Sequence, residues 1–116
     1  MSEIQRIGES ARWSGVVIYR GEARWVEVAD DASMDVRGQI SQILMQINAT
    51  LERIGGSRKG LLQVLIFLAD LNDGAILNEL WDAWVPAEDP PIRACVQAGL
   101  ARGYLVEMVI SAAVAG

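Results

Sequence analysis

The sequence predicts an α+β domain in which two helices cover one face of a β-sheet. Two segments have the apolar spacing of amphipathic helices, and the shorter segments around them are rich in β-branched residues. Their order along the chain is ββαβαββ, which is typical of an α+β sandwich. A chain of 116 residues has the size of one domain, so residues 1–116 are assigned to a single unit.

The first two strands are expected to form a hairpin within SGVVIYRGEARWVEVA, residues 14–29. Strands near 15–20 and 23–29 flank the tripeptide RGE, in which Gly21 can adopt the backbone conformation of a tight turn. The pattern therefore places two paired strands at the start of the domain.

The first helix is indicated by apolar residues that recur on one face after Met34. Ser33 or Asp35 can cap its start, and the pair Gly55-Gly56 can end it. The segment ERIGGSRKG is interpreted as the end of this helix and a solvated loop. The apolar face consists of Ile40, Ile43, Leu44, Ile47, Leu51 and Ile54.

The second half of the chain contains a strand, a helix and two further strands. LLQVLIFLAD, residues 61–70, is almost continuously apolar and fits a strand buried on both faces. Helical spacing returns within 72–86 and ends at Pro86, and strands follow at 92–98 and 104–114. The buried stripe of this helix is expected to be Ile76, Leu77, Leu80, Trp81 and Trp84.

Both faces of the last strand, 104–114, are mainly apolar. Met108 and Ile110 lie on one face, and Leu105 and Val109 lie on the other. Because two helices can cover only one face of a sheet, the other face calls for a partner, and we expect an oligomer. A hydrophobic content of 52% points the same way.

The composition argues against several functions. A net charge of −5 without a run of Lys or Arg disfavours nucleic-acid binding. No apolar run is long enough for a membrane span, no secretion signal is recognised, and the single cysteine fits a reducing cytosol, so a cytoplasmic protein is expected. The chain has no histidine, which removes Ser-His-Asp and Cys-His catalysis, and we expect neither a metal nor a cofactor.

Two charged residues, Arg93 and Glu107, interrupt apolar strands. Arg93 is either a surface charge or interface ion pair, or an anchor whose planar guanidinium binds a carboxylate. Glu107 is either one half of a structural ion pair, with Arg93 as the obvious partner, or a group that binds and polarises water. Periodicity does not show whether the two strands are neighbours.

The remaining polar and aromatic candidates have simpler interpretations. Cys95, two residues after Arg93, is read as a small buried hydrophobe rather than a nucleophile. Trp13 either packs or lines a cleft, and Asn78 is expected on the polar side of its helix. Residues 70–73 resemble a fragment of a calcium loop, but capping and turn formation explain them better.

The chain resembles the Rid family, also called YjgF-like and formerly labelled endoribonuclease L-PSP. The resemblance is carried by FLADLNDGAILNELWDAWV, PPIRACVQAGL and LVEMVISAAVA, and it extends from about ARWSGVVIYRG to the C-terminus. ARWSGVVI, WDAWV and VQAGL are most similar to a short-chain branch of the family. The resemblance implies a chorismate-mutase-like fold with a mixed sheet, and a homotrimer whose three sheets line a barrel and whose clefts lie at subunit interfaces.

The resemblance also implies an activity, the hydrolysis of reactive enamines and imines such as 2-aminoacrylate to 2-keto acids and ammonia. Arg93 matches the family's arginine that holds the substrate carboxylate, and Glu107 matches the carboxylate that orients water. Three further positions match the substrate-binding cleft, namely Cys95, Asn78 and Trp13.

One position departs from the family pattern. Members commonly carry Ser-Gly or Thr-Gly where this chain has Val26-Glu27. A Glu27 side chain in the cleft would compete with the substrate for Arg93, so weak deaminase activity and a gain on Glu27→Gly are expected. The alternative is a non-catalytic trimer that binds small acids or regulates a partner through the same clefts. The old ribonuclease label fits poorly with an acidic chain that lacks histidine.

Overall fold

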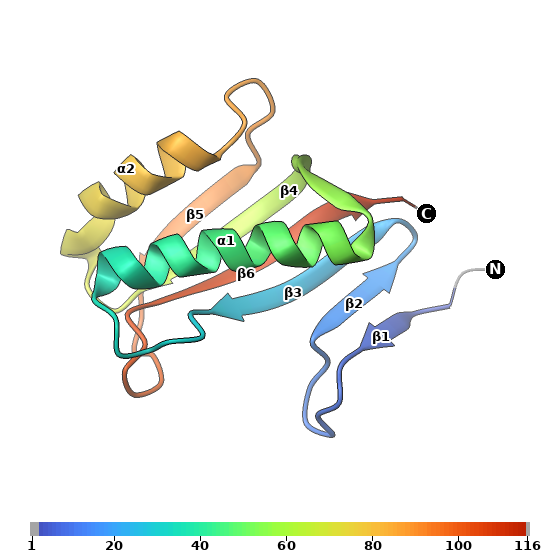
Figure 1. The fold of residues 1–116 in the computed structure, drawn as a ribbon, viewed down its shortest axis with the longest axis horizontal. Helices are drawn as coiled ribbons and strands as arrows, with labels where there is room; N and C mark the ends of the chain where they lie inside the picture. Colours follow the sequence, from blue (N-terminus) through green and yellow to red (C-terminus); the bar gives the residue numbers. More distant parts are fainter. Residues whose placement is uncertain (1–2, 116) are drawn as a thin grey trace.

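The computed structural model describes residues 3–115 and has two helices on one face of a six-stranded sheet (Figure 1). The strand order is β1-β2-β3-β6-β4-β5, in which β4 and β5 run parallel and the other neighbours run antiparallel. The predicted α+β class and mixed sheet are therefore confirmed. The elements are β1 (Gln5–Ile7), β2 (Val16–Tyr19), β3 (Glu22–Val28), α1 (Val36–Ile54), β4 (Gly56–Leu68), the 3-10 turn η1 (Leu71–Asp73), α2 (Gly74–Trp84), β5 (Ile92–Gln97) and β6 (Val106–Val114).

Local signals in the sequence account for the predicted hairpin and for both ends of α1. Arg20 and Gly21 form the turn between β2 and β3, with φ angles of 52° and 77°. Asp35 caps α1 by accepting a hydrogen bond of 2.8 Å from the backbone N–H of Gly38. Gly55 ends the helix in the left-handed conformation, with φ at 79°.

Two expectations about the chain were wrong. Strand β1 was not predicted, because three exposed residues carry no apolar alternation. The segment after α1 is the first part of β4 rather than a solvated loop, and the pairing of Gly56 with Val114 starts this part of the strand. At Gly60 a Cβ atom would lie 2.9 Å from the carbonyl oxygen of Ala113, so glycine allows the two backbones to approach closely. Because glycine is common in loops, its presence here suggested a loop instead of a strand.

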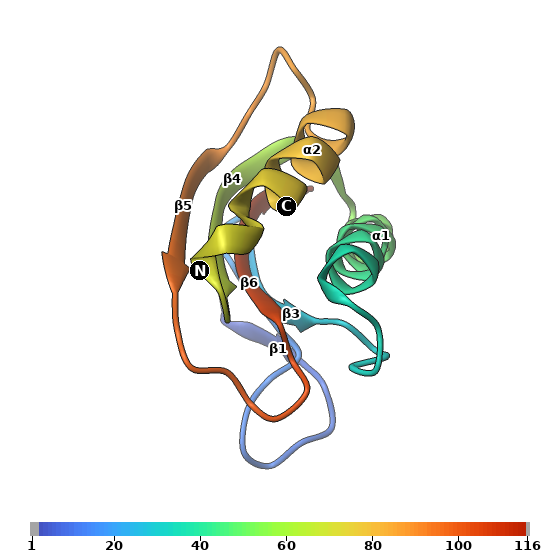
Figure 2. The same cartoon turned by 90° about the vertical axis from the view of Figure 1, so that its left-hand side faces the viewer.

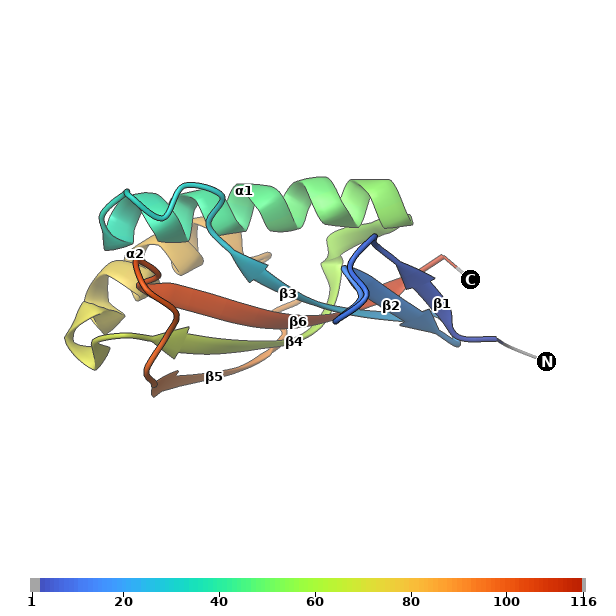
Figure 3. The same cartoon turned by 90° about the horizontal axis from the view of Figure 1, so that it is seen from below.

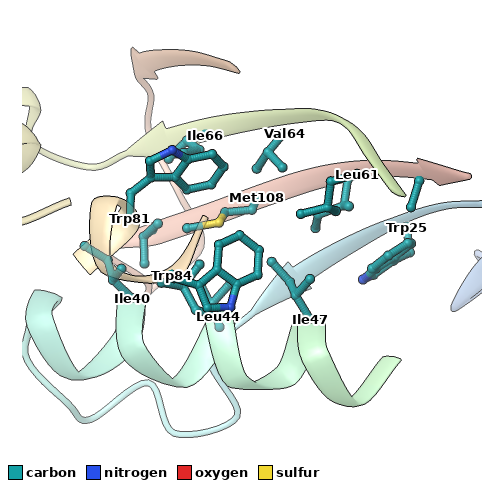
Figure 4. Close-up of a cluster of buried hydrophobic side chains, with 14 of the residues drawn as sticks. Trp25, Ile40, Leu44, Ile47, Leu61, Val64, Ile66, Trp81, Trp84 and Met108 are labelled. Carbon is teal, nitrogen blue, oxygen red and sulfur yellow. The ribbon is translucent and has the colours of Figure 1, made fainter. Parts of the chain in front are cut away.

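The hydrophobic core lies between the two helices and the sheet face that they cover (Figures 3 and 4). Alternate residues of the neighbouring strands β6 and β4, including Met108 and Ile66, are fully buried on this face. Ile43 and Ile47 of α1 pack against them, as the apolar spacing predicts. From α2 the fully or largely buried side chains are Leu77, Trp81 and Trp84.

The other face of the sheet, here called the open face, is covered by no helix of residues 3–115 (Figure 2). Val26, Ile92 and Val96 retain 55%, 68% and 43% of their surface on this face. Val26 aligns with Val109, and Val109 aligns with Leu65, so the apolar side chains form a row across the sheet. The two apolar faces predicted for the last strand are thus present, and one of them is uncovered.

Gln39 is a fully buried amide that joins two loops at one end of the sheet. Its Nε2 donates hydrogen bonds of 3.0 and 2.9 Å to the carbonyl oxygens of Met34 and Gly103. Its Oε1 accepts a hydrogen bond of 2.9 Å from the backbone N–H of Leu105. This side chain therefore holds the segment that enters β6.

Replacing Gln39 should destabilise the fold strongly, because Gln39→Leu leaves buried backbone groups without partners. We expect a loss of about 2–4 kcal/mol in the free energy of unfolding, measured by urea denaturation. Gln42→Leu is the matched control, since Gln42 accepts only the exposed Asp31 N–H bond and should cost under about 1 kcal/mol. Equal effects of the two substitutions would contradict the role given to Gln39.

Candidate functional site

Arg93 lies on the outer strand β5, on the face of the sheet that the helices cover. In the parallel β4–β5 pair it aligns with Val64, whose side chain is fully buried beneath the helices. The guanidinium reaches α2, where Nη2 donates a hydrogen bond of 2.9 Å to Oδ1 of Asn78. Its Cζ lies 5.3 Å from the ring centroid of Trp81. Arg93 is thus oriented by one helix of its own chain.

Asn78 and Trp81 can act together because they are three residues apart on one helix. Side chains at this spacing are neighbours on a helix surface. Trp81 belongs to the buried stripe and Asn78 is exposed at its margin, so Arg93 lies where the core meets solvent. Within residues 3–115 no carboxylate lies within salt-bridge distance of Arg93, and its charge is not neutralised by an ion pair.

Cys95 follows Arg93 on the same face and aligns with the buried Ile66. Burial raises the pKa of the Cys95 thiol, although the nearby charge of Arg93 acts in the opposite direction. The thiol is therefore protonated near neutral pH, and the protonated form is a poor nucleophile. This placement favours the interpretation of Cys95 as a packing residue beside the anchor.

Glu107 lies on the open face, opposite to the face that carries Arg93. It aligns with Val28 on one side and with Phe67 on the other, and its side chain is half-buried. No salt bridge to its carboxylate occurs within residues 3–115. Because β4 separates β5 from β6, Arg93 and Glu107 do not form an ion pair within one chain. A site that uses both residues requires a second chain.

Glu27 points toward α1 and is held by three side-chain donors. Its Oε1 accepts hydrogen bonds of 3.1 Å each from Trp25 Nε1 and Thr50 Oγ1, and its Oε2 accepts one of 2.9 Å from Gln46 Nε2. Glu27 aligns with the buried Met108, which confirms that it lies on the covered face. Strands β6 and β4 lie between it and Arg93, so within one chain it does not reach the anchor.

Trp13 lies in the segment between β1 and β2 and is 69% exposed. It is outside the hydrophobic core of its own chain, so the packing role considered for it is absent within residues 3–115. Residues 70–73 form a turn, as expected, in which Asp70 Oδ1 accepts a hydrogen bond of 2.9 Å from the backbone N–H of Asn72. Of the candidates, only Arg93, Cys95 and Asn78 come together.

Sequence reasoning missed two sets of contacts. It assigned Trp81 to the buried stripe of the helix and did not predict that Arg93 lies over the face of the Trp81 ring. The spacing of Asn78 and Trp81 is the signal that could have revealed this contact. It also missed Gln46 and Thr50 as partners of Glu27, and no local pattern links residues that lie so far apart in sequence.

Two general properties of the described part of the chain bear on possible chemistry. Within residues 3–115 there is no cluster of three or more Cys, Asp and Glu side chains that could hold a metal ion. None of the helices in that range combines the length and apolarity that a membrane crossing demands.

Comparison with protein families and sequences identifies relatives of the chain over nearly its whole length. The family model described as Endoribonuclease L-PSP matches residues 5–114. The RutC family protein YoaB of Escherichia coli is 45% identical over 112 residues, which cover 96% of this chain and 98% of that protein. A RutC family protein of Haemophilus influenzae is 39% identical over 112 residues, which cover 94% of this chain and 97% of that protein.

Solved structures give the same result at the level of the fold. A protein of Pseudomonas aeruginosa superposes with a TM-score of 0.92 at 36% identity, covering 97% of this chain and 100% of the other. NMB1025 of Neisseria meningitidis, a member of the YjgF protein family, superposes with a TM-score of 0.91 at 34% identity, covering 98% and 97%.

The placement of Glu27 predicts that its replacement costs stability. Glu27→Gly removes the acceptor for the buried Thr50 hydroxyl and the Trp25 indole N–H and puts glycine in a strand. We expect a loss of about 2–4 kcal/mol in the free energy of unfolding, and a smaller loss for Glu27→Gln, which keeps one acceptor oxygen. Thermal and urea unfolding of both variants measures this, and an unchanged Glu27→Gly variant would contradict the network.

Proposed function

The chain belongs to the Rid family of YjgF and RutC proteins, and from this premise we propose that it hydrolyses reactive enamines and imines of 2-amino acids to 2-keto acids and ammonia. The observation that carries the proposal is the Arg93 guanidinium, which is exposed, unpaired within residues 3–115, and held by Asn78 and Trp81. Such a group suits the carboxylate that every 2-imino acid and 2-keto acid contains.

Arg93 binds the substrate carboxylate in this proposal. Its fork can engage two carboxylate oxygens, and Asn78 occupies only one of the guanidinium nitrogens. The hydrophobic side of the substrate faces the margin of the core beside Cys95. Holding the carboxylate fixes the imine carbon at a defined place, which is the main requirement for attack by water.

Glu107 orients and activates the water in this proposal. The enamine first takes up a proton from solvent at its terminal carbon and becomes a protonated imine, whose C=N carbon is electrophilic enough for water to attack it directly. Water then adds to that carbon while Glu107 accepts a proton from it. The proton passes from Glu107 to the amino nitrogen of the carbinolamine. The C–N bond then breaks and ammonia leaves, while the hydroxyl group returns its proton to Glu107 and becomes the C=O group of the 2-keto acid.

The two groups act together only if chains associate, because Arg93 and Glu107 lie on opposite faces of one sheet. We therefore propose a homotrimer in which the open faces line a common interior and each cleft takes Arg93 from one chain and Glu107 from its neighbour. The exposed row around Val26 and Ile92 supports this assembly, since an uncovered apolar sheet face favours burial against a second copy. The cytosol, with its free thiols, is the compartment we propose for this trimer.

A second function, the binding of small acids without turnover, is favoured by one specific observation. The cluster of Arg93, Asn78 and Trp81 is complete within a single chain, whereas Glu107 is not part of it. A trimer that kept this cluster but failed to present Glu107 would bind 2-keto acids and regulate a partner through the same clefts.

Turnover of freshly generated 2-aminoacrylate tests the proposed hydrolysis. The protein should accelerate release of pyruvate and ammonia above the uncatalysed rate. Arg93→Ala should lower kcat/KM by roughly 30- to 1000-fold, and Arg93→Lys should restore little because the ammonium lacks the fork. Glu107→Gln should lower kcat by roughly 100-fold with little change in KM.

The controls separate the two candidate functions. Binding of pyruvate without any acceleration of hydrolysis would support the binding trimer and exclude the deaminase. Hydrolysis that survives Arg93→Ala within a few fold would remove Arg93 as the anchor. A Glu107→Gln variant that loses stability and activity together would favour a structural role for that carboxylate.

The oligomeric state provides a separate test. Light scattering at micromolar concentration should give about three times the chain mass of 12.6 kDa. Val26→Glu places a charge in the row of apolar residues on the open face and should shift the protein toward monomer. Met45→Glu is the matched control, because Met45 is 71% exposed on the helix side, and that variant should remain a trimer. A monomeric parent protein would contradict the proposed cleft.

A further inference from the structure

We infer that Trp81 fixes the guanidinium of Arg93 for carboxylate binding, so that this core residue is also a positioning residue of the proposed site. The inference rests on the proposed function in one respect, namely that Arg93 is the carboxylate anchor. Trp81 itself has no contact with the substrate in this account. It acts through Arg93, whose Cζ lies 5.3 Å from the ring centroid.

The indole of Trp81 is a rigid platform because it is almost completely buried. Only 6% of its surface is exposed, and the ring of Trp84 packs 5.5 Å away at an angle of 51°. Trp84 also donates a hydrogen bond of 3.0 Å from its Nε1 to Asn48 Oδ1 on α1, but the Trp84 ring, and not this bond, is what packs against Trp81. The position of the Trp81 ring is therefore fixed by the packing of both helices (Figure 4).

Trp81 and Asn78 restrain Arg93 in complementary ways. The negative face of an indole attracts the face of a guanidinium. The N–H groups at the edge of the guanidinium remain free to donate hydrogen bonds. The bond from Nη2 to Asn78 then fixes the rotation of the guanidinium on that face. A side chain held in this way loses less conformational entropy when a carboxylate binds, so affinity for the carboxylate rises.

An aromatic ring positions the arginine without neutralising its charge. Helix α2 also carries an example of the opposite arrangement, in which a carboxylate holds an arginine. Arg37 bonds to Glu79, the residue that follows Asn78, and that carboxylate satisfies its charge. If a carboxylate held Arg93 in the same way, it would compete with the substrate for the fork. Trp81 attracts the Arg93 cation without supplying a negative charge, so the substrate carboxylate is the anionic partner of Arg93.

Binding of pyruvate, measured by calorimetry, tests the inference in the assembled protein. Trp81→Leu removes the π face and should weaken binding roughly 3- to 10-fold, whereas Trp81→Phe keeps an aromatic face and should stay within about threefold of the parent. Trp84→Phe is the matched control, because it loses the hydrogen bond to Asn48 but keeps a ring beside Trp81. It should lower the Tm without weakening pyruvate binding.

A ligand-free measurement shows whether the ring holds the guanidinium. In ¹⁵N-labelled protein, the Arg93 Hε resonance should be shifted upfield by the Trp81 ring current. The shift should disappear in Trp81→Leu and persist in Trp81→Phe and Trp84→Phe. If Trp81 only packs in the core, Trp81→Leu should lower the Tm but leave the Arg93 Hε resonance where it is in the parent. Alternatively, Trp84→Phe should weaken pyruvate binding as much as Trp81→Leu does. Either result would overturn the inference.

Kinetics separate this inference from the proposed function. If the parent hydrolyses imines, Trp81→Leu should raise KM severalfold and change kcat little, because the ring acts on binding of the carboxylate. If the parent binds pyruvate but hydrolyses nothing, the deaminase proposal fails while the binding and resonance measurements still decide the role of Trp81. A parent that binds no 2-keto acid overturns both the anchor and its positioning residue.

Discussion

Coverage of one sheet face by both helices is the constraint on which the other features of this molecule depend. Strand alternation assigns every second residue to the covered face, where α1 and α2 bury it, and the intervening residues to the open face. Arg93 and Glu27 fall on the covered face and meet side chains of the helices. Glu107 falls on the open face, which no helix of residues 3–115 covers. The division between faces therefore separates the two groups that the proposed reaction needs, and it makes association a requirement of the chemistry rather than an addition to it.

Three charged groups of the chain, two on the covered face of the sheet and one between the helices, are held in different ways. Glu27 accepts three hydrogen bonds from neutral donors, so its carboxylate is occupied within its own chain. Arg37 pairs with Glu79 in solvent, and this pairing lowers the pKa of the Glu79 carboxyl. Arg93 has an amide and an aromatic face and no carboxylate within residues 3–115. Of these three arrangements, the third leaves a fixed positive charge available to a ligand, because Arg93 has no carboxylate partner within residues 3–115.

The sequence predicted those parts of the structure that follow from periodicity and local signals. The apolar spacing and the caps at Asp35 and Gly55 placed α1, and alternation gave the two faces of β6. Alternation is relative within each strand, however, and the faces of separate strands are linked only by their register. The opposite faces of Arg93 and Glu107 follow from their alignment with Val64 and Phe67 on β4, which no local pattern reveals. For the same reason the glycines that begin β4 were interpreted as a loop, because the backbone they approach belongs to the distant end of the chain.

Trp81 illustrates how a core residue and a site residue can be the same side chain. Apolar spacing explains its burial completely, and on that basis nothing further would be asked of it. One face of the ring lies at the margin of the core, and β5 brings Arg93 over that face. A tryptophan in this position contributes apolar area to folding and electrostatic attraction to the cation at once. Leucine can replace the first contribution but not the second, and phenylalanine retains much of both, so the two substitutions distinguish packing from positioning at this one residue.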